Sequence, residues 1–222
     1  MLTINQYDGT PAIAWYRRTL AQKTIDALAK RNITGLYFES GREAAEAVLA
    51  MIPAQATVGF GGSVTLHSLG LYQQILEGPY RSFNRFDSTL TGEQLLEVQR
   101  QALLADWFLT GTNAITLDGR LVNIDGRGNR VAALLFGPKR VVVVCGTNKI
   151  VPTLDDALER VKQVACPLNA RRLGLRIPCG LTGVCHDCTR TDQRMCNLIT
   201  IVEGQQDPTR MTVVLVGETL GF

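Results

Sequence analysis

The sequence has 222 residues, of which 45% are hydrophobic and 19% charged, a composition typical of a globular chain with a buried core. The net charge is only +3, and no basic run or basic–aromatic alternation occurs, which argues against nucleic-acid binding. No signal-peptide pattern opens the chain and no apolar run could cross a bilayer, so we expect a cytoplasmic protein without membrane contact. Six cysteines in a reducing compartment favour metal binding or catalysis over disulfides.

The first half of the sequence alternates between predicted helices and predicted strands. Residues 11–31 have apolar positions at helical spacing and predict a long helix, whose buried face would carry Trp15, Leu20, Ile25 and Leu28. Three further helices are predicted to begin at Ser40, Thr91 and Thr153, because each is followed three residues later by Glu, Gln or Asp. In such a capping box the two side chains satisfy free amides of the first turn.

Short apolar runs bounded by Gly and polar residues predict the strands. They are residues 35–38, 57–60, 107–110, 121–124, 131–136, 140–144, 198–202 and 211–216. Continuous apolar runs are typical of strands buried on both faces, as in a parallel sheet covered by helices, so we expect an α/β protein. We expect a single domain over residues 1–222, within which residues 171–197, rich in Cys, Gly, Arg and Asp, form an irregular segment.

A glycine-rich turn follows the predicted strand at 57–60. Gly61, Gly62 and Ser63 lie where this strand gives way to a helix. Glycines let backbone amides approach a ligand closely and a helix N-terminus favours an anion, so these residues are candidates for binding a phosphate or carboxylate. A tight turn capped by Ser63 explains the pattern equally well without a ligand. The turn is neither a Walker A motif nor a complete dinucleotide fingerprint, and we expect no nucleotide cofactor.

A second polar segment contains two Asp-Gly pairs. The first, at 118–119, lies between apolar runs and predicts a hairpin turn. The second begins with Asp125 and is followed by Arg127, Asn129 and Arg130. Arginines bind carboxylates through two parallel hydrogen bonds, so this group could orient a small anionic substrate. The alternative is that Asp125 and Arg127 pair on the surface and fix a loop.

Lys149 follows the most apolar predicted strand, at 140–144. In open α/β sheets ligands bind beyond the carboxyl ends of strands, so Asn148 and Lys149 lie where site residues are expected. An ordinary solvated lysine is the alternative. Lys149 and Asp125 are the two weak candidates for a catalytic role.

Four cysteines form the most specific motif of the sequence. Cys179, Cys185, Cys188 and Cys196 are arranged C-x5-C-x2-C-x7-C. A C-x2-C pair can reach one metal centre, and soft thiolates select zinc or an iron–sulfur cluster in a reducing cell. The spacing matches neither a zinc ribbon nor a bacterial ferredoxin; we place an iron–sulfur cluster ahead of zinc. A redox-active C-x2-C disulfide and a set of buried structural thiols are the alternatives.

The other cysteines and both histidines are left outside any site. Cys145 ends an apolar strand and is expected in the core, and Cys166, at the end of a predicted helix, is excluded from the cysteine cluster. His186 lies inside the cysteine motif and could replace a ligand, but we expect it beside the ligands or at the surface. His67 is expected on the surface of a helix or packed against it.

Several of these motifs together resemble the lactate-utilisation (LUD) domain family, which includes LutC-type proteins. They lie at residues 58–63, 110–116, 123–130, 136–139, 146–151 and 217–222. The resemblance implies a three-layer α/β/α sandwich with a mostly parallel sheet, similar to ribose-5-phosphate isomerase (RpiA), glucosamine-6-phosphate deaminase (NagB) and CoA transferases. In those relatives a loop similar to residues 61–63 holds a phosphate, and an acidic residue near Asp125 would act as acid or base.

The resemblance to LutC-type proteins implies a role beside iron–sulfur oxidoreductase subunits in the oxidation of lactate. The cysteine motif resembles that of a short single-domain subgroup, which broadens the expected substrate to a small carboxylate or a phosphorylated metabolite. We therefore predict a redox-linked metabolic protein whose anion-binding residues are Gly61, Gly62, Ser63, Asn113, Arg127, Asn129 and Arg130. The alternatives are an accessory or ligand-sensing module with a structural metal, and an isomerase- or CoA-transferase-like enzyme.

Overall fold

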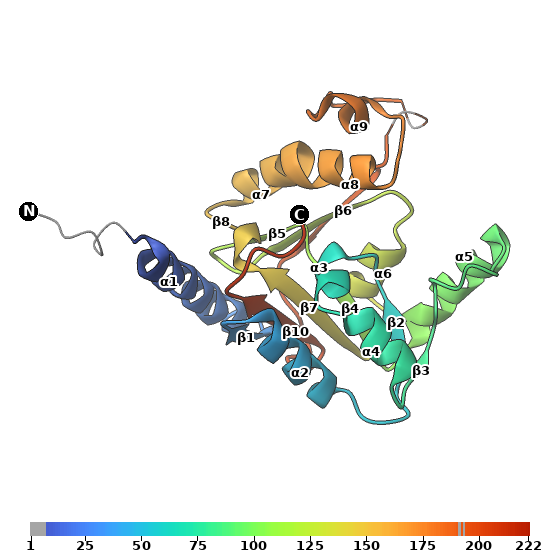
Figure 1. Ribbon diagram of the computed structural model, residues 1–222, viewed down its shortest axis with the longest axis horizontal. Helices are drawn as coiled ribbons and strands as arrows, with labels where there is room; N and C mark the ends of the chain where they lie inside the picture. Colours follow the sequence, from blue (N-terminus) through green and yellow to red (C-terminus); the bar gives the residue numbers. More distant parts are fainter. Residues whose placement is uncertain (1–7, 191, 193) are drawn as a thin grey trace, which may run out of the picture.

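The computed structural model of the chain describes residues 8–190, 192 and 194–222. Residues 1–7, where the sequence lacks a signal-peptide pattern, lie outside this part. Six strands form the larger sheet, and every pairing within it is parallel (Figure 1). In spatial order they are β1 (Thr34–Phe38), β10 (Met211–Val216), β7 (Arg140–Gly146), β4 (Trp107–Gly111), β2 (Thr57–Phe60) and β3 (Arg81–Ser82).

Helices cover both faces of this sheet, and strand β7 in its middle shows how. Because successive strand residues point to opposite faces, Val141, Val143 and Cys145 pack on one side and Val142 and Val144 on the other. The first side is covered by α1 (Thr10–Ala29) and α6 (Asn129–Leu135), and the second by α2 (Gly41–Met51), α3 (Val64–Ser68) and α4 (Leu71–Glu77). The predicted α/β/α sandwich and the core position of Cys145 are confirmed.

A second sheet of four strands packs beside the first. Its order is β8 (Ile150–Val151), β5 (Ala114–Thr116), β6 (Leu121–Asp125) and β9 (Leu198–Val202). Strands β5 and β6 are antiparallel and joined by the turn at 118–119, which confirms the predicted hairpin. The runs at 121–124 and 198–202 are strands as predicted, but they belong to this sheet rather than to the main one.

The second sheet carries a helical layer of its own. Ile115, Leu121 and Val202 point into the core shared with α1, whereas Ala114 and Val122 face the opposite way. That outer face is covered by α7 (Leu154–Arg160), a π-helical turn (Val161–Ala165) and α8 (Cys166–Arg172), which run on continuously above β5 and β6 (Figure 1). Helix α8 thereby comes to overhang the end of the main sheet.

All three predicted capping boxes are present. Ser40 caps α2, Thr91 caps α5 (Gly92–Gln101) and Thr153 caps α7. In each, the cap hydroxyl accepts from the backbone three residues on, and the side chain there accepts from the cap backbone N–H. These helix starts depend on contacts within one turn, which is why the sequence alone predicts them.

Two predictions about elements are wrong. Residues 131–136 were expected as a strand, but Val131, Ala133 and Leu134 are buried on one side of helix α6, while Phe136 just beyond it is 85% exposed. A short apolar run fits a strand and a buried helix equally well, and Ala and Leu favour the helix. Trp15 is 67% exposed because the first turns of α1 extend beyond the sheet that the helix covers.

The segment between α8 and β9 includes the short helix α9 (Pro178–Thr182), which lies above α8 in Figure 1. None of the described helices is long and apolar enough to cross a membrane.

Candidate functional site

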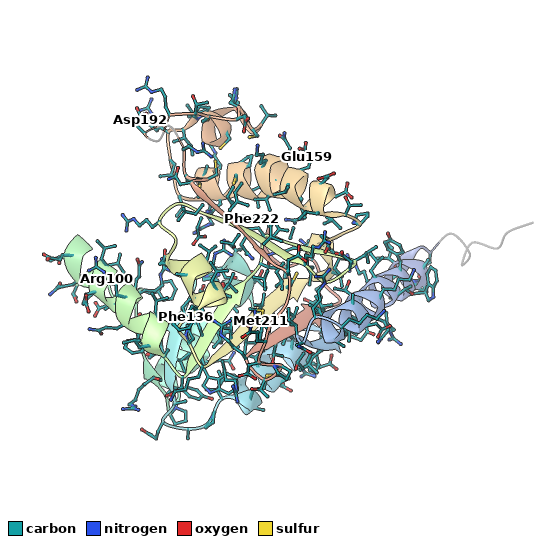
Figure 2. The ribbon with its side chains drawn as sticks, turned by 180° about the vertical axis from the view of Figure 1, so that it is seen from behind. Arg100, Phe136, Glu159, Asp192, Met211 and Phe222 are labelled. Carbon is teal, nitrogen blue, oxygen red and sulfur yellow. The ribbon has the colours of Figure 1, made fainter. Side chains whose placement is uncertain are left out.

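A cleft of about 500 Å³ opens at the carboxyl ends of β2, β4 and β7. Because neighbouring parallel strands end at the same edge, residues that follow three different strands meet there. Helix α8 contributes the opposite wall, and Phe222 lies between the two (Figure 2). The polar and charged side chains that line the cleft are Ser63, Arg85, Gln99, Thr112, Asn113, Asp125, Arg127, Asn129, Arg130, Lys149, Asn169 and Arg172.

Lys149 is the most buried of the charged side chains that line the cleft, with only 3% of its surface exposed. Its ammonium group donates to the Thr65 hydroxyl at 3.0 Å and to the Thr112 carbonyl at 3.2 Å. No carboxylate in the described part of the chain forms an ion pair with it, which leaves the third N–H without a protein acceptor. The pKa of Lys149 is lowered to about 8, chiefly by burial and in smaller part by the neighbouring cations Arg160 and Arg130.

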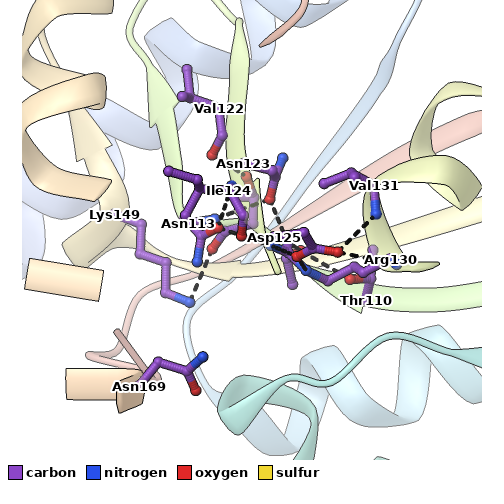
Figure 3. Close-up of polar contacts among 12 residues, drawn as sticks. Thr110, Asn113, Val122, Asn123, Ile124, Asp125, Arg130, Val131, Lys149 and Asn169 are labelled. Atoms are coloured by element: carbon purple, nitrogen blue, oxygen red, sulfur yellow. Dashed lines mark hydrogen bonds and ion pairs between the residues drawn. The ribbon is translucent and has the colours of Figure 1, made fainter. Parts of the chain in front are cut away.

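Arg130 is the most heavily hydrogen-bonded side chain of the cleft (Figure 3). Its Nη2 lies 2.8 Å from Asp125 Oδ1, and the two side chains are only 9% and 12% exposed. The guanidinium also donates to the side chains of Asn113 and Asn123 and to the carbonyls of Gly111 and Ile124. All five of its donors are therefore used within the protein. This geometry makes Arg130 a positioning residue that fixes the cleft wall, and it argues against direct contact with an anion.

Asp125 is the only Asp or Glu among the described residues that line the cleft, and it belongs to this network. Its Oδ1 accepts from the Arg130 guanidinium, and its Oδ2 accepts from the backbone amides of Arg130 and Val131. The alternative of a surface pair between Asp125 and Arg127 is wrong, because the partner is Arg130 and the pair is buried. With both oxygens engaged, Asp125 has a structural role in the cleft wall.

Asn113 links this network to Lys149. Its Oδ1 accepts from the Ile124 amide at 3.0 Å and from Arg130 at 2.9 Å. These bonds fix the orientation of the carboxamide. Its NH2 group then points toward Lys149 and can donate to a ligand in the cleft (Figure 3). Asn148, by contrast, is used to bind the backbone of Leu220 and Gly221.

The glycine turn after β2 forms one rim of the cleft. The Ser63 hydroxyl accepts from the Leu66 amide, so the predicted helix cap is confirmed. The Ser63 amide donates to the Tyr72 hydroxyl, which in turn donates to the Gly61 carbonyl at 2.7 Å. A side chain at Gly61 would collide with Thr110, so glycine there is required by packing. Anion binding by this turn stays a prediction.

Three further arginines line the cleft, and sequence reasoning identified only Arg127. Arg85, in the loop after β3, is half-buried, and burial lowers the pKa of its guanidinium. Arg172, on α8, donates to Asn169, which also lines the cleft. No described carboxylate pairs with any of the three. Neither Arg85 nor Arg172 lies in a recognisable motif; the fold alone brings them to this site.

Five cysteines surround a second, smaller cavity of about 90 Å³. They are the four of the predicted motif, Cys179, Cys185, Cys188 and Cys196, together with Cys166 at the start of α8. Cys166, which the sequence leaves outside the metal-binding set, therefore lies beside the four motif cysteines in the folded chain. Its thiol hydrogen-bonds with that of Cys196, which raises the pKa of Cys166 and lowers that of Cys196 to about 6. The sequence does not indicate this contact, because Cys166 and Cys196 are far apart along the chain.

The donor set of this cysteine cavity fits a thiophilic metal centre, since four soft thiols from one segment face a common space. In the part of the chain that the structure describes, no three His, Cys, Asp or Glu side chains converge closely enough to hold a single metal ion. His186 is exposed and contacts the Thr182 hydroxyl. His67 is exposed on α3, as expected.

Comparison with known proteins gives the family. The LUD domain profile matches residues 21–216, and no curated protein matches the chain. A crystal structure of a DUF162 family protein from Deinococcus radiodurans is similar, with a TM-score of 0.50 and 17% identity, covering 90% of this chain and 98% of that one. The delta subunit of eIF2B from Chaetomium thermophilum is a partial match, with a TM-score of 0.33 and 20% identity over 54% of this chain and 50% of that one. Because the family profile spans most of its length, the chain belongs to the LUD-domain family.

Proposed function

We propose that the cleft binds a small metabolite that carries two or more negative charges, and that Lys149 anchors one of its anionic groups. The observation that carries this proposal is the buried Lys149 ammonium, which has hydrogen-bond partners but forms no ion pair with any carboxylate of the described residues. A buried charge is costly unless it is paired. An anion in the cleft would supply the missing partner and offset that cost.

The number of unpaired cations favours a substrate with several charges. Arg85, Arg127 and Arg172 line the same cleft as Lys149, and the one described Asp or Glu side chain there, Asp125, is already paired with Arg130. Guanidinium groups bind phosphate and carboxylate oxygens in pairs of hydrogen bonds. A cleft of about 500 Å³ also has room for more than a three-carbon acid. A phosphorylated metabolite or a dicarboxylate therefore fits better than lactate.

The proposal includes a redox-linked role, because the cysteine cavity adjoins the cleft. Cys166, Met195 and Ile124 line both spaces. Zinc or an iron–sulfur cluster bound by Cys179, Cys185, Cys188 and Cys196 would lie directly behind this wall, and an iron–sulfur cluster supplies or accepts single electrons. The protein's own residues would bind and orient the anion in front of the wall.

Thermal unfolding in the presence of defined anions tests the anion site. We expect glucose 6-phosphate, inorganic phosphate or citrate to raise the melting temperature by several degrees at a concentration near 100 times the dissociation constant. Lactate should give a smaller shift. Arg85→Gln and Arg127→Gln should each reduce the shift, because each removes a cation that faces the bound ligand.

Arg42→Gln is the matched control, because Arg42 lies on α2 with its side chain 85% exposed. It should leave the ligand-induced shift unchanged. Equal shifts in Arg85→Gln, Arg127→Gln and Arg42→Gln would mean that the anions act on the protein surface in general, and would contradict the proposed cleft.

A further inference from the structure

The cysteine cavity and the anion cleft share one wall. Of the residues that line the cleft, Cys166, Met195 and Ile124 also line the cysteine cavity. Cys166, the first residue of α8, is held in this wall because it packs in the core between the helical layer and the second sheet and its thiol contacts that of Cys196. Whatever occupies the cysteine cavity therefore lies close to whatever occupies the cleft.

The thiols surround their cavity without converging on one point. Tetrahedral zinc with Zn–S bonds of about 2.3 Å would hold its sulfurs about 3.8 Å apart. No three potential ligands among the described residues converge on a single ion position in this way, yet all four motif cysteines border one cavity of about 90 Å³. In a cluster with four irons each thiolate binds a different iron, so the sulfurs stay farther apart. The arrangement suits a cluster better than an ion.

The charges around the cysteine cavity also favour an iron–sulfur cluster over a zinc ion. Lys162, Asp187 and Arg194 line it. Lys162 pairs with Asp187 at 2.8 Å, so the remaining positive charge is that of Arg194, whose guanidinium donates to the backbone carbonyls of Cys188 and Cys196. These bonds fix the loop that carries two of the thiols. A cluster held by four thiolates has a net negative charge, which nearby cations stabilise.

We propose that Cys179, Cys185, Cys188 and Cys196 bind an iron–sulfur cluster rather than a zinc ion, and that its oxidation state is coupled electrostatically to anion binding across the wall of Cys166, Met195 and Ile124. The first half of this inference stands on the thiol arrangement alone. The second half rests on the proposed function of the cleft.

The expected coupling follows from Coulomb's law. When dithionite donates one electron, no bond in the protein is made or broken, and one negative charge is added behind the wall. If the cluster and the anion lie about 12 Å apart at an effective dielectric constant of about 20, the added charge lowers the affinity for the anion about tenfold for each negative charge that the anion carries. Because linkage is reciprocal, a tenfold effect equals a midpoint potential lowered by about 59 mV when the anion saturates the cleft.

Metal analysis of the full chain, purified without oxygen, tests the first half. We expect iron and acid-labile sulfide in equal amounts and a broad visible absorption that dithionite bleaches. Cys188→Ala should lose the iron, whereas Cys166→Ala and the core variant Cys145→Ala should keep it. Colourless wild-type protein with stoichiometric zinc would overturn the assignment, whether or not Cys188→Ala folds.

A spectroscopic redox titration, with and without inorganic phosphate, tests the second half. Saturating phosphate should lower the midpoint potential in wild-type protein but not in Lys149→Met, which keeps the cysteines and lacks the anchor. An unchanged potential despite calorimetrically measured phosphate binding would overturn the coupling alone. If phosphate does not bind at all, both the coupling and the proposed binding of phosphate in the cleft are contradicted. The iron content would still show whether the cysteines bind an iron–sulfur cluster.

Discussion

Arg130 and Asp125 show how a charged pair can build a cleft without acting on its ligand. Both are buried, and the two Asp125 oxygens accept four hydrogen bonds, two from the Arg130 guanidinium and two from backbone amides. Removing one partner of a buried pair leaves an uncompensated charge, which is strongly destabilising.

We therefore predict that Asp125→Asn lowers the free energy of unfolding by about 3–5 kcal/mol. Asparagine has one acceptor oxygen, so one of the two pairs of donors would face its NH2 group. Urea denaturation measures the change. Glu46→Gln removes the carboxylate of an exposed pair with Arg42 on α2 and should change stability by less than about 1 kcal/mol. Similar losses for the two variants would contradict the structural role of Asp125.

At this scale the sequence predicts only part of the site. Lys149, Arg127 and Asn113 were identified because they follow strands or lie in polar motifs, and all three line the cleft. Arg85 and Cys166 were missed for one physical reason. Each reaches its site through tertiary packing with segments that are distant along the chain, and no local sequence pattern indicates such contacts.

At the scale of elements, rules that act within one turn were the most informative. The capping boxes at Ser40, Thr91 and Thr153 and the hairpin turn at 118–119 are all present. The wrong assignment of residues 131–136 arose where the choice between helix and strand depends on what the run packs against. Local chemistry therefore predicted where elements begin, and tertiary contacts decided one element's type.

The hairpin turn gives a test at this scale. Gly119 has φ of +89°, and an added Cβ would lie 3.0 Å from the Leu28 backbone nitrogen. We expect Gly119→Ala to lower the free energy of unfolding by at least about 1 kcal/mol, because an L-residue is strained there and α1 blocks its side chain. Gly92→Ala, at the open first position of α5, should be neutral or stabilising. No difference between the two would contradict the turn geometry.

Across the whole molecule, the second sheet and its helical layer are what turn the edge of a parallel sheet into an enclosed site. They place α8 over the strand ends (Figure 1), and the cysteine cavity shares lining residues with the cleft. The alternation of helices and strands predicted the main sheet. It did not predict this second layer, because strands β6 and β9 carry the same apolar pattern whichever sheet they join.

The central claim is that a protonated Lys149 anchors an anion, and calorimetric titration of wild-type protein and Lys149→Met with citrate at pH 7 and pH 9 tests it most directly. Because burial holds the pKa of Lys149 at about 8, the wild-type ammonium is charged at pH 7 and mostly neutral at pH 9. Wild-type affinity should therefore fall about tenfold between them. Lys149→Met should bind at least about thirtyfold more weakly at pH 7, with little dependence on pH. Equal affinity of the two proteins at pH 7 would contradict the account.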